Sequence, residues 1–191
     1  MTDQPLTSEE RGLLLQLARQ SIERAVQSAP LPDVDLAGLP PRLVETGVCF
    51  VTLTTRSGDL RGCIGALEAF QPLALDVCQH AASAALDDYR FDPVRPEEVP
   101  NLVIEISRLT APQPLTYERP EELPRLLHPP HDGVVLRDGA HRATFLPQVW
   151  EKLPDPAAFL SHLCQKMGLP SSTWQRKLLQ VAIYHVEEFH E

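Results

Sequence analysis

The residues best suited to chemistry lie in the hexapeptide Leu60-Arg61-Gly62-Cys63-Ile64-Gly65, which places a thiol two positions after a guanidinium and between two glycines. A nearby cation stabilises a thiolate, the form of cysteine that acts as a nucleophile. Glycines lack a Cβ, so a ligand or another backbone segment can approach the strand closely. The hexapeptide therefore indicates a reactive cysteine or a recognition surface, and the competing interpretation is a small buried cysteine beside a structural arginine.

A β-hairpin is predicted to position this hexapeptide. The run 48–55 is rich in β-branched and aromatic residues, and the tetrad Arg56-Ser57-Gly58-Asp59 that follows favours a turn. The hexapeptide comes next and forms the second strand. We expect a tight turn centred on the second and third residues of the tetrad to fix the pairing of the two strands.

This register determines which side chains share a face. It pairs Thr52 with Cys63 and Thr54 with Arg61, because antiparallel partners count outward equally from the turn. Side chains alternate along a strand, so these four residues are predicted to lie together on the more polar face. Cys49 is predicted to point to the opposite face, into the core.

Composition restricts the classes of protein to consider. The chain has 191 residues, of which 43% are hydrophobic and 23% charged, as in an ordinary globular protein with a sizeable core. Its net charge of −9 disfavours a surface that follows phosphates, so we expect no nucleic-acid binding. We see neither a basic segment leading into an apolar run nor a stretch of about 18 apolar residues. A cytoplasmic protein without membrane contact is therefore expected.

The cysteines argue against a structural metal and against disulfides. Cys49, Cys63, Cys78 and Cys164 include no CxxC pair, so zinc-ribbon spacing is absent, and we expect no metal and no other cofactor. In a reducing compartment all four are predicted to be free thiols.

The remaining elements are read from caps and periodicity. Thr7-Ser8-Glu9-Glu10 forms a capping box for a helix at about 7–29. A second helix is predicted from Pro72 to about Leu86, and its polar stripe of Asp76, His80, Ser83 and Asp87 favours a solvated face over the wall of a cleft. The later predictions are a strand at 102–107, a hairpin at 133–137 and 141–146, helices at 156–167 and 171–177, and a strand at 181–186.

The order hairpin, helix, strand thus occurs twice. It predicts an α+β fold with a mainly antiparallel sheet, curled into a barrel-like shape, and with helices outside. We expect one domain over 1–191 that contains two interlocked subdomains or pseudo-repeats at about 45–110 and 130–190.

The hexapeptide resembles the signature of the AMMECR domain family, whose microbial members are called AmmeMemoRadiSam system protein A. The resemblance covers nearly the whole chain. The chain departs from the family pattern at Tyr89, where relatives commonly carry proline, and at Met167, where they often carry alanine. Further matching segments, in the expected order, are 47–53, 81–85, 90–93, 105–107, 133–134, 144–150, 159–160 and 166–169.

This resemblance implies a compact α+β fold of two interlocked subdomains, without implying a particular reaction. It also implies partners, because the family name refers to co-occurrence with a Memo-like protein, similar to metal-dependent extradiol dioxygenases, and with a radical-SAM enzyme. We therefore expect these two proteins as pathway partners, together with a small molecule of unspecified class.

Three interpretations of the hexapeptide follow. In the first, the chain is an enzyme or enzyme subunit in which Cys63 is the nucleophile or carrier, Arg61 or Arg90 holds an anionic group, and an acid or His80 moves protons. None of the seven histidines has a spacing that predicts contact with Cys63. In the second, the chain is a non-catalytic adaptor or small-anion-binding protein; in the third, the strand is a packing joint between the two halves. The residues assigned to the surrounding surface are Thr52, Thr54, Gly62, Gly65, Arg90 and Asp92.

Overall fold

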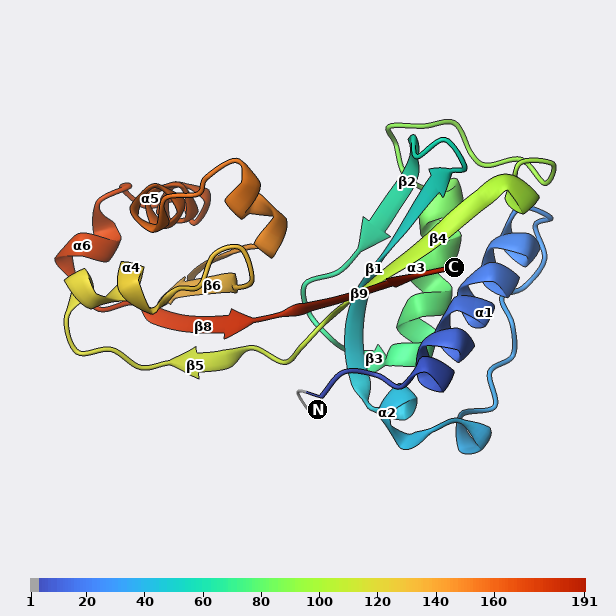
Figure 1. Cartoon of the computed structure of the whole chain (residues 1–191), viewed down its shortest axis with the longest axis horizontal. Coiled ribbons are helices and arrows are strands. Elements are labelled where there is room, and N and C mark those ends of the chain that lie inside the picture. The colour runs from blue at the N-terminus through green and yellow to red at the C-terminus, as the bar shows by residue number, and fades with distance from the viewer. Residues whose placement is uncertain (1–3) are drawn as a thin grey trace. The chain divides into compact units, whose positions relative to one another are not determined.

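The computed structural model describes residues 4–191 and divides into two compact units (Figure 1). Unit 1 extends to Thr110 and also includes Glu187–Glu191, whereas unit 2 is Ala111–Val186. Within the described residues, every helix is too short or too polar to span a bilayer.

Each helix and strand predicted from the sequence is present, with its ends moved by a few residues. The elements in and adjoining unit 1 are α1 (Ser8–Ala25), η1 (Leu36–Gly38), α2 (Pro41–Val44), β1 (Thr46–Thr55), β2 (Leu60–Gly65), β3 (Gln71–Pro72), α3 (Leu73–Leu86), η2 (Val99–Asn101), β4 (Leu102–Leu109) and β9 (Val186–His190). Those of unit 2 are β5 (Gln113–Leu115), η3 (Pro120–Glu122), α4 (Leu123–Leu126), β6 (Gly133–Asp138), β7 (His141–Phe145), η4 (Pro147–Glu151), α5 (Pro156–Lys166), α6 (Thr173–Arg176) and β8 (Gln180–Tyr184).

Helix α1 begins at its predicted capping box and ends earlier than predicted. The Thr7 hydroxyl accepts a hydrogen bond from the Glu10 N–H, and the Glu10 carboxylate accepts one from the Thr7 N–H. At the other end Ser28 has a φ of 56°, and the Ala29 N–H donates to the Arg24 carbonyl. This left-handed residue with its backward hydrogen bond closes the helix before the predicted end at 29.

In unit 1 the strands follow the order β2-β1-β4-β9, and β3 pairs with the start of β1. The pairs of β1 with β2, β3 and β4 are antiparallel. Helices α1 and α3 contribute to one core with β1 and β4, so they cover one face of this sheet (Figure 1). The fully buried side chains of this core include Ile22, Val51, Leu53, Ile104 and Ile106.

In unit 2 the strands follow the order β5-β8-β6-β7, and the pairs β5–β8, β6–β8 and β6–β7 are antiparallel. Its core is centred on Phe159 of α5, whose ring stacks on Trp150 at 3.7 Å between centroids. The predicted α+β class with antiparallel sheets is therefore confirmed. The barrel-like shape is wrong, because both strand orders are open paths with too few strands to close around a core.

The two sheets share one topology. In each, the strand that follows the hairpin and the helix (β4 or β8) lies beside the first strand of the hairpin (β1 or β6). The chain then leaves β4 to form β5 of the other sheet, and it leaves β8 to form β9. The pseudo-repeat boundaries at about 45–110 and 130–190 stay a prediction.

The predicted hairpin register is confirmed for Cys63 and wrong for Arg61. Thr52 pairs with Cys63 as predicted, whereas Thr54 pairs with Leu60 and not with Arg61. The register shifts by one residue between these two pairs, and Arg61 is the additional residue, so it lies in a β-bulge.

The loop is one residue longer than predicted, and the bulge at Arg61 compensates this difference before the strand reaches Cys63. The loop contains three residues, not two, because the Thr55 N–H donates to the Asp59 carbonyl at 2.9 Å. Gly58 has a φ of 90°, which only glycine adopts readily. This loop moves the pairing by one residue, and the bulge at Arg61 moves it back.

Helix α3 rests directly on the backbone of β2. A Cβ added to Gly62 would lie 2.0 Å from the Ala84 carbonyl oxygen, and one added to Gly65 would lie 2.4 Å from the Phe50 ring. Real Cβ atoms do not tolerate such distances, so both positions require glycine. The close approach expected at these glycines is made by the protein's own helix and by its own aromatic ring.

We predict that Gly62→Ala lowers the free energy of unfolding by about 1–3 kcal/mol, because the added methyl group forces α3 away from β2. Gly12→Ala is the matched control: Gly12 is exposed in α1 with nothing within 4 Å of the added Cβ. It is expected to raise the free energy of unfolding by about 0.5–1 kcal/mol. Denaturant unfolding measures both, and equal effects of the two substitutions would contradict the packing described.

Candidate functional site

Cys63 lies on the face of the sheet opposite to the core. It is half-buried, whereas the other three cysteines are buried. The Thr52 hydroxyl donates a hydrogen bond to Cys63 Sγ at 3.3 Å, across the strand pair. Glu105 of β4 pairs with Thr52 on its other side, and burial raises the pKa of the Glu105 carboxyl. The predicted burial of Cys49 on the opposite face is confirmed.

Arg61 is held by the loop that precedes η2. Its Nε and Nη2 donate to the two carboxylate oxygens of Glu98, at 2.9 and 3.2 Å, and its Nη1 donates to the Asp92 carbonyl at 2.8 Å. The Arg61 guanidinium holds the pKa of Glu98 below its usual range. Asp92 thus enters the site through its backbone, and its side chain is exposed. The Arg61 guanidinium is thus directed to this loop rather than to the sulfur of Cys63.

The backbone of Cys63 is held by residues that follow α3. Its N–H donates to Asp88 Oδ2 at 2.8 Å, and its carbonyl accepts from Arg90 Nη2 at 3.4 Å. Arg90 also forms a bidentate pair with Asp88, with Nε 2.8 Å from Oδ1 and Nη2 2.6 Å from Oδ2. The Asp88–Arg90 ion pair therefore provides hydrogen-bond partners for both the N–H and the carbonyl of Cys63.

These bonds close an edge of the sheet. Strand β2 ends the strand order, so the N–H and carbonyl of Cys63 point outward and would otherwise be unpaired. A residue whose backbone groups point outward forms a non-hydrogen-bonded pair with its cross-strand partner, and such pairs bring side chains close together. This explains the contact between Cys63 and Thr52.

The ion pair leaves a cation at the edge of the site. The Arg90 guanidinium holds the pKa of the buried Asp88 carboxyl well below its usual range, and Asp88 raises the pKa of Arg90. Arg90 itself is 44% exposed and lies over the Phe91 ring at 5.5 Å. Thr54 lies further along β1, opposite Leu60, and is half-buried.

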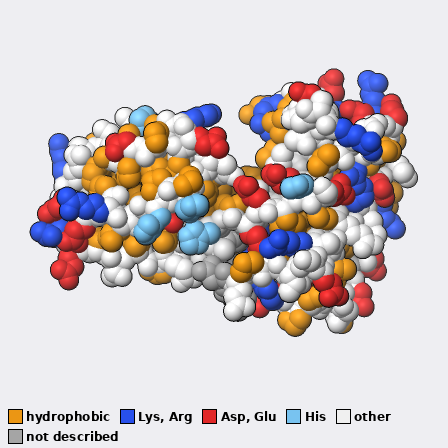
Figure 2. All heavy atoms as spheres, viewed as in Figure 1, with side chains coloured by type: hydrophobic (Ala, Val, Ile, Leu, Met, Phe, Trp, Pro, Cys, Tyr) orange, Lys and Arg blue, Asp and Glu red, His pale blue; other side chains and the backbone are white. Residues whose placement is uncertain are grey.

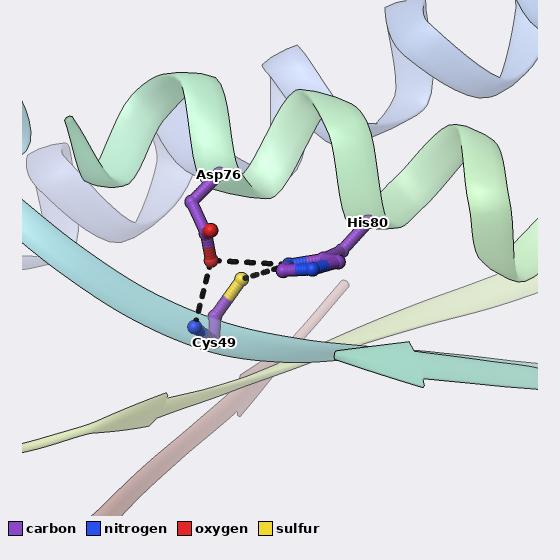
Figure 3. Close-up of side chains that lie close together, drawn as sticks. All are labelled: Cys49, Asp76 and His80. Atoms are coloured by element: carbon purple, nitrogen blue, oxygen red, sulfur yellow. Dashed lines mark hydrogen bonds and ion pairs between the residues drawn. The ribbon is translucent and has the colours of Figure 1, made fainter. Parts of the chain in front are cut away.

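A second cluster, which the sequence did not predict, lies on the core side of β1 (Figure 3). Asp76 Oδ2 accepts the Cys49 N–H at 2.9 Å and lies 3.1 Å from His80 Nδ1, which is 3.9 Å from Cys49 Sγ. Asp76 is fully buried and His80 is 8% exposed, so the favoured solvated stripe is wrong for these two residues. Their spacing of four residues was visible in the sequence, but their burial depends on how α3 packs against β1.

The position of Asp76 follows from the end of β2. The last β2 residue, Gly65, pairs with Phe50, so the backbone of Cys49 extends beyond the strand. The Ala66 N–H donates to the Cys49 carbonyl at 3.3 Å, and Asp76 takes the N–H. Burial, followed by the nearby Asp76 charge, raises the pKa of the Cys49 thiol.

Unit 2 contains a cleft and a separate buried acid. The cleft has a volume of about 550 Å³, and Leu115, Tyr117, Val135 and Arg137 are among the residues that line it. Elsewhere, Asp132 is buried and lies 3.2 Å from His185 Nε2. Figure 2 shows histidine side chains gathered on the surface of this unit. Neither feature involves the residues predicted from the hexapeptide.

Comparison with known proteins gives consistent matches over nearly the full chain. The AMMECR1 family model matches residues 15–189. A protein of Thermofilum pendens is 38% identical over 202 residues, which cover 97% of this chain and 92% of that protein. A protein of Methanothermobacter thermautotrophicus is 37% identical over 191 residues, covering 98% and 97%. The crystal structure of the uncharacterized protein PH0010 from Pyrococcus horikoshii is similar with a TM-score of 0.78 and 34% identity, covering 97% of this chain and 93% of that one.

We predict that Asp88→Asn lowers the free energy of unfolding at pH 7 by about 1–3 kcal/mol, because it removes the charge that Arg90 and the Cys63 N–H bind. The folded-state pKa of Asp88 is lowered, so its contribution is present above the unfolded pKa of about 3.9 and is lost as the pH falls below that value. The difference between wild type and variant should therefore narrow between pH 5 and pH 2, roughly the range in which such carboxylates titrate.

The neighbouring Asp87 provides the control, because its side chain is exposed. Asp87→Asn is expected to change the free energy of unfolding by less than about 0.5 kcal/mol at either pH. Denaturant unfolding at several pH values measures all three proteins. A difference for Asp88→Asn that stays constant down to pH 2 would show that the charge of Asp88 is not what stabilises the fold.

Proposed function

We propose that this chain, which belongs to the AMMECR1 family, is an enzyme or enzyme subunit whose reactive group is the Cys63 thiol. The observation that carries the proposal is that Cys63 alone among the four cysteines is not buried. Burial raises the pKa of the thiols of Cys49, Cys78 and Cys164, which disfavours their thiolate forms. Only Cys63 therefore combines access with a polar environment.

The surroundings of Cys63 support a role in nucleophilic or carrier chemistry. The Thr52 hydroxyl donates a hydrogen bond to the sulfur at 3.3 Å, so the sulfur has a polar neighbour on the same face of the sheet. Arg90 is partly exposed beside the Cys63 carbonyl and can bind an anionic substrate group. Arg61 takes a positioning role, because Glu98 and the Asp92 carbonyl hold its guanidinium.

We propose a subunit rather than a complete enzyme because acid–base groups are missing beside the sulfur of Cys63 in the described residues. Within residues 4–191, no imidazole or carboxylate is hydrogen-bonded to the sulfur of Cys63. Acid–base groups would then come from substrate or from a partner protein. We propose a Memo-like protein and a radical-SAM enzyme as these partners, and the cytoplasm as the location of the assembly. The co-occurrence to which the family name refers supports the choice of partners.

The alternative is a non-catalytic adaptor or small-anion-binding protein that uses the same strand as its recognition surface. Arg90 favours it, because an exposed guanidinium whose position is fixed by Asp88 is suited to a carboxylate or phosphate group. The third interpretation, a packing joint between the two halves, stays a prediction, because the packing contacts of Gly62 and Arg61 do not involve unit 2. Those contacts lie within unit 1, between β2, α3 and the loop after it.

Selective alkylation tests the accessibility of the thiol. We predict that limiting iodoacetamide labels the folded protein at Cys63 before the other three cysteines, because they are buried. Peptide mass spectrometry locates the label. Cys63→Ser should lose this fast phase, whereas Cys78→Ser should retain it. Labelling of Cys78 at the same rate as Cys63 in the folded protein would remove the main support for the proposal.

Reconstitution separates the enzyme from the adaptor. The chain is copurified with the Memo-like and radical-SAM proteins, and the assembled set is screened for turnover. If the thiol reacts, Cys63→Ser should leave assembly intact and reduce turnover by at least about 100-fold, whereas Cys78→Ser has little effect. Full turnover with Cys63→Ser would support the adaptor, and Arg90→Ala should then weaken the assembly.

A further inference from the structure

We propose that Cys49, Asp76 and His80 form a binding site for a thiophilic divalent metal ion of the class of Zn²⁺ or Co²⁺. The three residues provide a thiol, a carboxylate and an imidazole, which are the three side-chain types that bind zinc in proteins. They come from two elements, β1 and α3, and they point toward one another (Figure 3). This site is separate from Cys63, which lies on the other face of the same sheet.

The separations of the donor atoms fit one tetrahedral ion. Metal–ligand bonds of about 2.0–2.3 Å in tetrahedral geometry place neighbouring ligand atoms about 3.4–3.6 Å apart. His80 Nδ1 lies 3.1 Å from Asp76 Oδ2 and 3.9 Å from Cys49 Sγ. One donor atom from each residue lies within 4.8 Å of the other two. An ion between them therefore requires side-chain adjustments of only a few tenths of an ångström to about one ångström.

The charge of the cluster favours a cation. Asp76 is 0% exposed, and a buried carboxylate is costly unless a positive charge or several hydrogen bonds compensate it. Among the described residues, its partners are the Cys49 N–H, the Gln71 amide and His80, with no lysine or arginine. A divalent ion would supply the missing positive charge and would bind the thiol as a thiolate.

The surrounding groups orient the ligands. Gln71 Nε2 donates to Asp76 Oδ1 at 3.3 Å, which leaves Oδ2 facing the other two donors. Such hydrogen bonds from outside the coordination sphere fix the direction of a ligand and strengthen binding. His80 is 8% exposed, so it is the ligand of the three that has contact with solvent. Three protein ligands leave a fourth coordination position for water or another small ligand.

The competing explanation is that the three residues only join α3 to β1 through their hydrogen bonds, without a metal ion. Both explanations use the same contacts, so they differ only in whether the cluster binds an ion through the sulfur of Cys49. A spectroscopic probe of the sulfur separates them.

The experiment uses the full chain, freed of metal by a chelator and titrated with cobalt(II) chloride. We expect about one Co²⁺ per chain and a thiolate-to-cobalt charge-transfer band in the near ultraviolet, with visible bands of tetrahedral intensity. Zn²⁺ should displace the cobalt and remove the bands. Cys49→Ser should lose the charge-transfer band, and Asp76→Asn should weaken Co²⁺ binding by at least about tenfold.

Two controls keep the result independent of folding defects in the buried variants. Wild-type protein whose Cys63 has been alkylated should retain the full band. Cys78→Ser, a change at a buried thiol of α3 outside the cluster, should retain it also. Circular dichroism establishes that each variant is folded. Absence of the band in folded wild type, its persistence in Cys49→Ser, or its loss on alkylation of Cys63 would each overturn the proposal.

Discussion

The packing of α3 on the β1–β2 hairpin is the contact on which the rest of unit 1 depends. Gly62 has no Cβ, so the Ala84 carbonyl reaches the backbone of β2. Because the helix lies so close, a carboxylate near each of its ends reaches the hairpin backbone. Asp76 accepts a hydrogen bond from the N–H of Cys49, and Asp88 accepts one from the N–H of Cys63. Each carboxylate thereby satisfies a strand N–H that no neighbouring strand pairs. The surroundings of both cysteines thus follow from one helix lying close to one hairpin.

Local sequence was sufficient to predict the elements and much of the hairpin. The capping box at Thr7 and the alternation along 48–55 are set by neighbouring residues, so they could be read directly. The opposition of Thr52 and Cys63 was correct although the loop length was wrong, because the bulge at Arg61 compensates the additional loop residue. Such a compensation depends on where Arg61 finds its partners, and Glu98 lies far along the chain.

The features that escaped prediction are all tertiary. The stripe of Asp76 and His80 looks polar on an isolated helix, and polar stripes usually face water. Here the stripe faces Cys49, whose free N–H requires an acceptor. The pairing of Arg90 with Asp88 was equally hard to predict. A spacing of two residues in a loop does not show that both side chains will hydrogen-bond the backbone of a distant strand. The sequence therefore located the hairpin strand that carries Cys63 without revealing how the strand is held.

The crossing of the chain between the two sheets affects the order in which the protein is made. Strand β9 adds to the sheet of unit 1, yet it is synthesised only after the whole of unit 2. While the ribosome translates 111–186, the β4 edge of the nascent first unit lacks its β9 partner, and open strand edges pair readily with other chains. Completion of the first unit is thus coupled to synthesis of the second, and contacts so distant in sequence form slowly. In the nascent chain, unit 2 is an insertion between two neighbouring strands of unit 1.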